Sequence, residues 1–193
     1  MGSSGVEAVQ ALWIGQRSAK TVGQGGHEGL LLPADRPGLY LLTSMPARST
    51  AALERLQATT LAEVELPDGR TARFLYSVPY SGPALQQKLG YTPLAFTSDF
   101  IQLVGYEWPD DALPGATASL AEYWRFLEVG DEVRGAQHSA YNQLYYADGR
   151  KAAQDDGFSL PEADWRPDHL LVQWFDLALP ADLPAGDYML LTG

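Results

Sequence analysis

The stretch "SAYNQLYYADGRKAAQDDG" (Ser139–Gly157) decides the fold class of this 193-residue chain. Its Asp148-Gly149 pair separates two segments with strand-forming residues, and an Asp-Gly pair in that position favours a tight hairpin turn. Side chains alternate between two faces of a strand, so Tyr141, Gln143 and Tyr145 share one face of the first segment. The stretch therefore predicts an antiparallel β-hairpin.

Short strand-like segments continue on both sides of this hairpin, with Pro- and Gly-rich turn signals between them. They are Phe100–Trp108, Thr117–Glu128, Leu170–Leu179 and Gly186–Gly193. A weak helical period competes in Ser119–Phe126. Six or more short strands at this spacing predict a mainly β fold over residues 93–193, an antiparallel two-sheet β-sandwich of the jelly-roll or Ig-like kind.

Residues 1–92 mix apolar strand-like runs with one helical period, which predicts a small α+β lobe before the sandwich. The helix is expected after Pro46, with Ser49 or Thr50 as its N-cap. Its apolar residues fall on one face: Ala52, Leu53 and Leu56. A small lobe of this kind packs one helix face against strands.

Turn signals divide the rest of this lobe. The alternating segments on either side of Pro67–Arg70 ("PDGR") predict a second hairpin. The three Gly and Pro residues of the motifs "SGP" and "TP" within Tyr80–Ser98 predict a linker on the surface. The glycines of Gly23–Gly29 ("GQGGHEG") predict a flexible turn, because a phosphate-binding loop needs Lys-Ser/Thr and a helix directly afterwards.

The charge is distributed unevenly along the chain. The net charge is −11, with 8 Lys/Arg against 7 Asp/Glu in residues 1–98 and 5 against 17 in residues 99–193. An acidic second half argues against nucleic acid as a partner, since binding to phosphates requires cations. The chain has no cysteine, which excludes disulfides and thiolate chemistry, and no apolar run is long enough to span a membrane.

Several motifs of the second half resemble one family when taken together. They are "FIQLVGYEW", "LAEYWRFL", "YNQLYYADGRKAAQDDG" and "LPADLPAGDYMLLTG". This combination, over about residues 96–193, resembles the C-terminal domain of certain bacterial multi-spanning membrane glycosyltransferases, relatives of the dolichyl-phosphate-mannose protein mannosyltransferases. The chain departs from that pattern at Asp168, where glycine is usual.

The resemblance implies an extracytoplasmic domain tethered to the membrane region of a parent protein, its expected partner. Catalysis in those enzymes belongs to the membrane region, so the resemblance implies a non-catalytic accessory domain, with contact to glycan as its expected activity. The last strand, Gly186–Gly193, continues into further sequence in that family, which suggests that this chain is a fragment. The alternative is a structural or protein–protein interaction sandwich with no ligand of its own.

Aromatic residues provide the candidate glycan contacts. Strand alternation leaves aromatics on both faces of several predicted strands, so some rings are expected on the solvent side. A flat exposed ring flanked by polar side chains can stack on a sugar while the polar groups bind its hydroxyls. The candidate contacts are Trp174, Tyr145, Gln143 and Trp165.

Carboxylates in the acidic segment 155–168 provide a candidate calcium site. Loop carboxylates are the ligands that calcium prefers, and Asp155, Asp156 and Asp164 are the candidates. Paired carboxylates also serve glycoside hydrolysis, so a calcium-dependent hydrolase is a third alternative. No serine has the surroundings of a nucleophile elbow, and His27, His138 and His169 lack zinc-binding spacing, so we expect no enzymatic activity and no other cofactor.

Overall fold

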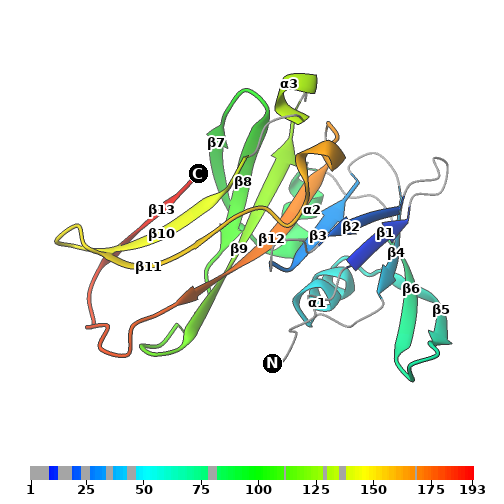
Figure 1. Ribbon diagram of the computed structural model, residues 1–193, viewed down its shortest axis with the longest axis horizontal. Helices are drawn as coiled ribbons and strands as arrows, with labels where there is room; N and C mark the ends of the chain where they lie inside the picture. The colour runs from blue at the N-terminus through cyan, green and yellow to red at the C-terminus, as the bar shows by residue number, and fades with distance from the viewer. Residues whose placement is uncertain are drawn as a thin grey trace.

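The computed structural model describes residues 9–12, 19–22, 27–33, 37–42, 47–77, 82–110, 112–127, 130–134, 138–167 and 169–193. The chain is mainly β, with three antiparallel sheets, few helices, and no closed barrel among the described strands (Figure 1). Parts of the predicted segments Gly23–Gly29 and Tyr80–Ser98, and Asp168, where the chain departs from the family pattern, lie outside the described residues.

The central sheet has five strands in the order β3-β12-β9-β8-β7. Its strands are β3 (Gly29–Leu32), β7 (Thr92–Thr97), β8 (Ile101–Glu107), β9 (Thr117–Phe126) and β12 (Leu170–Ala178). β9 and β12 pair over nine residues at its centre, and most of their residues are buried on both faces. Burial on both faces explains why these strands have apolar runs in place of strict alternation. The weak helical period over 119–126 is overridden by this pairing.

The small sheet has three strands in the order β11-β10-β13. They are β10 (Tyr141–Tyr146), β11 (Lys151–Asp156) and β13 (Tyr188–Thr192). The predicted hairpin at Asp148-Gly149 is confirmed: Gly149 has φ +82°, and its N–H donates to the carbonyl of Tyr146 at 3.0 Å. Asp148 Oδ1 accepts the N–H of Arg150 at 3.0 Å, which holds the turn in place.

The small sheet covers one face of the central sheet, and the two share one buried cluster. Representative members are Leu31, Leu120 and Trp124 of the central sheet and Leu144 and Ala153 of the small one. Side chains of both sheets thus form a common apolar layer, as in sheets packed face to face. Two short elements contact each other beside this layer, helix α3 (Asp131–Arg134), whose Val133 packs against it, and the 3₁₀ helix η2 (Glu162–Asp164).

The third sheet belongs to the first half of the chain and has the order β2-β1-β4-β6-β5. Its strands are β1 (Val9–Leu12), β2 (Ala19–Val22), β4 (Gly38–Leu42), β5 (Thr59–Glu65) and β6 (Thr71–Ser77). β5 and β6 form the second predicted hairpin, and its Asp-Gly-Arg turn repeats the first one, with Gly69 at φ +83°. Both hairpins therefore arise from the same local chemistry.

A second buried cluster joins this sheet to the other face of the central sheet. It includes Tyr40 of β4, Leu53 of helix α1 (Ala47–Arg55), Leu89 of helix α2 (Gly82–Leu89) and Val172 of β12. The prediction that Ala52, Leu53 and Leu56 form the buried helix face is confirmed. β3 lies before the predicted domain boundary at residue 93 but pairs with β12, so the two halves of the chain contribute strands to one sheet.

The predicted N-cap of α1 is wrong. The helix begins at Ala47, so Ser49 and Thr50 both lie inside its first turn. The N–H of Ser49 donates instead to Glu28 Oε1 at 2.6 Å, and Arg48 Nε pairs with Glu28 Oε2 at 2.8 Å. A carboxylate from a distant segment thus takes the role expected of a local hydroxyl, and it satisfies an N–H that the helix leaves free.

The predicted linker over 80–98 is also wrong, because it contains α2 and β7. Proline is favoured in the first turn of a helix, and Pro83 occupies that place in α2. Gly90 follows the last helical residue with φ +82°, and its N–H donates to the carbonyl of Gln86 at 2.7 Å. The Gly and Pro residues there mark the ends of a helix.

Candidate ligand pocket between the two sheets

A pocket of about 810 Å³ opens between the central sheet and the small sheet. Its walls come from β7, β8 and β9 on one side, from β10 and β13 on the other, and from two loops at one end. The apolar lining residues are Leu94, Tyr106, Trp108, Ala112, Pro114, Leu144, Leu179, Leu183, Pro184, Ala185, Tyr188 and Leu190. Gly186, Glu122 and Thr192 complete the lining. The pocket is thus an apolar space with few polar groups.

Strand alternation on β13 builds one wall. Tyr188, Leu190 and Thr192 are half-buried and line the pocket, whereas Met189 and Leu191 between them are exposed on the other face. The strand pairs with β10 on one side only, because it is the edge of its sheet. The two sheets therefore leave a space at this edge that side chains do not fill.

Two Pro- and Gly-rich loops close one end of the pocket. They connect β8 to β9 and β12 to β13, and each supplies lining residues. The N–H of Gly115 donates to the carbonyl of Pro180 at 3.0 Å, and the N–H of Leu179 donates to the carbonyl of Ala116 at 2.9 Å. These backbone hydrogen bonds hold the loops together, so this end of the pocket is preformed.

Glu122 on β9 is the polar centre of the pocket. The residue is 0% exposed, and its carboxyl group is held from three sides. Oε2 accepts hydrogen bonds from Trp124 Nε1 at 3.0 Å and Asn142 Nδ2 at 3.4 Å, and Oε1 contacts the hydroxyl of Thr192. Because Asn142 and Thr192 lie on β10 and β13, this carboxyl group links the central sheet to both strands of the opposite wall.

Burial raises the pKa of Glu122 from 4.5 to about 7, and the hydrogen bonds from Thr192, Asn142 and Trp124 oppose this rise. The carboxyl group is therefore present in both protonation states near neutral pH. It can donate one hydrogen bond when protonated and attract a cation when ionised. A carboxyl group with a raised pKa in the wall of a cavity is a typical mark of a functional site.

The structure places both candidate tryptophans inside cores. Trp165 is fully buried, stacks on Phe126 with ring centroids 4.7 Å apart, and donates from Nε1 to the carbonyl of Leu160 at 3.0 Å. Trp174 is 5% exposed and belongs to the cluster beneath the helices. The expectation that candidate rings face solvent is therefore wrong for both: Trp174 lies on a strand that is covered on both faces, and Trp165, directly after η2, packs into the core.

Tyr145 and Gln143 lie together on the outer face of the small sheet. The hydroxyl of Tyr145 donates to Gln143 Oε1 at 2.6 Å, and both side chains are half-buried. Tyr141, two residues before Gln143, is 39% exposed on the same face. Leu144 points the opposite way and lines the pocket. These two candidates are therefore brought together, but away from Glu122.

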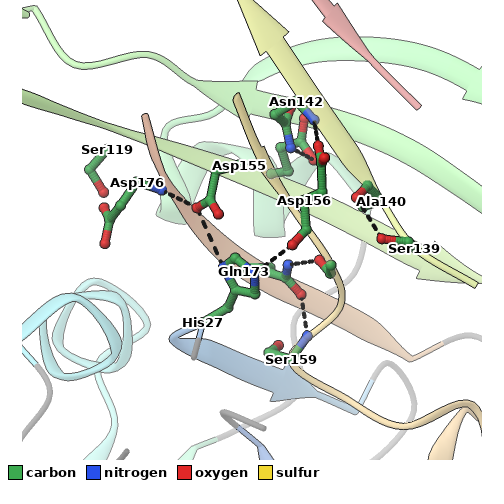
Figure 2. A network of polar contacts seen from close by, with 12 residues as sticks. His27, Ser119, Ser139, Ala140, Asn142, Asp155, Asp156, Ser159, Gln173 and Asp176 are labelled. Atoms are coloured by element: carbon green, nitrogen blue, oxygen red, sulfur yellow. Dashed lines mark hydrogen bonds and ion pairs between the residues drawn. The ribbon is translucent and has the colours of Figure 1, made fainter. Parts of the chain in front are cut away.

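The candidate calcium ligands are divided between two places. Figure 2 shows Asp155 and Asp156 within a network around His27. Asp155 Oδ2 accepts the N–H of Asp176 at 2.6 Å and lies 3.5 Å from His27 Nδ1, while Asp156 Oδ1 accepts the N–H of Asn142 at 3.1 Å. Asp164 lies on η2, outside this network. Within the described ranges, no group of three or more acidic or histidine side chains is arranged to hold a metal ion.

Glu122 was not predicted from the sequence, although a signal for it exists. Glu122 is the acidic residue inside the otherwise apolar strand "SLAEYWRF", and a charge in a doubly buried strand needs partners. Trp124 lies two positions away, but the other two partners, Asn142 and Thr192, lie 20 and 70 positions away along the chain, so the sequence does not identify them.

Comparison with known proteins gives no relative from which a role could be transferred. No family model, no curated protein and no solved structure matches this chain. Function is therefore inferred from the geometry of the pocket.

Proposed function

We propose that this protein binds a small, largely apolar molecule between its two sheets and holds one polar group of that molecule at Glu122. The observation that carries the proposal is a fully buried carboxyl group in the wall of an otherwise apolar pocket of about 810 Å³. Ligand sites typically have volumes of roughly 300–1,000 Å³, apolar walls and a few convergent polar groups.

The lining favours an apolar ligand over a sugar. A monosaccharide brings several hydroxyl groups, and each buried hydroxyl without a hydrogen-bond partner costs free energy. Apart from two tyrosine hydroxyls and the indole N–H of Trp108, the side chains of the pocket offer Glu122 and Thr192 as polar partners. A molecule with one polar end and an apolar body satisfies these partners and fills the remaining space.

Titration with Nile red, a neutral dye that fluoresces in apolar surroundings, tests the proposal. We expect saturable binding to the wild type and at least about tenfold weaker binding to Leu190→Trp, because the indole occupies part of the pocket. Met189→Trp is the matched control, since Met189 is the neighbouring residue on β13 and is 55% exposed on the opposite face. Absence of binding to the wild type, or equal losses in both variants, contradicts the proposal.

A second proposal concerns the outer face of the small sheet. There the protein serves as a non-catalytic, glycan-contacting accessory domain, with the two packed sheets forming a jelly-roll or Ig-like sandwich. Its support is the adjacent pair Tyr145 and Gln143 beside the exposed ring of Tyr141. The described part of the chain contains no helix long and apolar enough to cross a membrane.

Titration with bacterial-envelope glycans tests the second proposal. We expect a saturable response that Tyr145→Ala weakens by at least about tenfold, because a stacking ring is lost. Leu61→Ala is the control, since Leu61 is also an exposed apolar residue but lies on β5. Equal glycan affinity in both variants argues against this face. A large loss of glycan affinity in Leu190→Trp would indicate that the glycan binds in the pocket.

A further inference from the structure

We infer that the pocket selects molecules whose polar end is a protonated amine, attached to an apolar body. This inference rests on the proposed apolar-ligand function and adds the chemical class of the ligand. It follows from the sign of the charges in and around the pocket and from the hydrogen-bonding capacity beside Glu122.

The interior of the pocket offers a negative charge and no positive one. Among the described lining residues, Glu122 is the acidic group, Tyr106 and Tyr188 are the other titratable side chains, and none is Lys, Arg or His. A ligand carboxylate placed here would face another carboxylate in an apolar environment, where repulsion is strong. An ammonium group would form a charge-assisted hydrogen bond with Glu122.

The loops at the closed end of the pocket are also negatively charged. The segments 109–116 and 179–187 contain four aspartates and no Lys or Arg. Asp110, Asp182 and Asp187 are exposed there. Arg150, which interacts with Asp182, is already paired with Asp148 at 2.8 Å. The field near the pocket therefore attracts cationic ligands and repels anionic ones.

The side chains around Glu122 have an unused acceptor. Neighbouring strands place Tyr106, Asn142, Gln173 and Thr192 around it. Both amide atoms of Gln173 are occupied, by the N–H of Ser159 and the carbonyl of Gly157. Oδ1 of the fully buried Asn142, by contrast, has no hydrogen-bond partner among the described residues, although Asn142 does not itself line the pocket. An ammonium group brings three N–H donors to Glu122, whereas a hydroxyl brings one.

Binding of an amine should be coupled to proton release. Because the pKa of Glu122 is about 7 in the free protein, a cation beside it must stabilise the carboxylate and displace the proton. Amine affinity should therefore rise with pH and level off above the pKa. Between pH 6 and pH 8 we expect an increase of about tenfold, and none for a neutral ligand of the same length.

Calorimetric titration of the full chain with decylamine, decanol and decanoate tests the inference. At pH 8 we expect decylamine to bind about tenfold or more tightly than decanol, and decanoate to bind most weakly. In Glu122→Gln the preference for decylamine over decanol and its pH dependence should both disappear. Asp187→Asn is the control for general acidity and should keep the preference within about twofold.

The outcomes distinguish a failure of the amine selectivity from a failure of the proposed apolar-ligand pocket. If decanol binds as tightly as decylamine, or if Glu122→Gln keeps the preference, the amine inference is overturned while the apolar pocket stands. If decanoate binds most tightly, the sign of the selectivity is wrong and the inference is overturned as well. If none of the three binds and Nile red also fails, both the inference and the proposed function are overturned.

Discussion

Trp165→Ala is expected to lower the free energy of unfolding by about 3–5 kcal/mol. Trp165 is fully buried, and its ring contacts Phe126, Phe158 and Phe100. Removing the ring leaves a cavity and leaves the carbonyl of Leu160 without its indole partner. Urea denaturation followed by far-ultraviolet circular dichroism measures the change.

Tyr145→Ala provides the comparison for this measurement. Tyr145 is a half-buried aromatic on the outer face of the small sheet, so its truncation should cost no more than about 1 kcal/mol. From the sequence, Trp165 and Tyr145 were both predicted to be glycan contacts. Equal losses in the two variants would contradict the assignment of Trp165 to the core, whereas a large difference separates a packing residue from a surface one.

Local signals explain the parts of the fold that the sequence predicted. The hairpins at Gly69 and Gly149 were found because an Asp-Gly pair, alternating neighbours and a following arginine act within a few residues. The helical period of α1 was equally local and gave its buried face. Its start depends on Glu28, which lies outside the helix, so the N-cap prediction failed.

Long-range pairing explains the failures. β9 and β12 are buried on both faces, so alternation along them could not show which residues face solvent, and Trp174 was misplaced for this reason. The joining of β3 to β12 is a contact between distant segments that composition does not reveal. The pocket has the same origin, because its polar centre needs side chains from three strands to meet.

Glu122→Gln is expected to change how stability depends on pH. Glu122 has a pKa of about 7 in the folded protein against 4.5 when exposed, so the folded state keeps a proton that the unfolded state releases. Stability contributed by this group is therefore fully present below pH 4.5 and is lost as pH rises toward 7. This difference in pKa corresponds to about 3 kcal/mol.

Glutamine can replace the protonated acid and keep its three hydrogen bonds. Its oxygen can accept the hydrogen bonds of Trp124 and Asn142, and its NH₂ group can donate to the hydroxyl of Thr192. Glu122→Gln should thus match the wild type near pH 4.5 and be more stable at pH 8, by up to about 3 kcal/mol.

Urea denaturation of both proteins at half-unit steps from pH 4.5 to pH 8 measures this divergence, without added ligand. Glu54→Gln is the matched control, because Glu54 is an exposed carboxyl on α1 and its removal should give a curve parallel to the wild type. Parallel curves for Glu122→Gln would mean that its carboxyl group is not buried in the pocket wall. A variant less stable at every pH would mean that the surrounding donors require the carboxylate, and the polar centre would then be a structural link between the sheets.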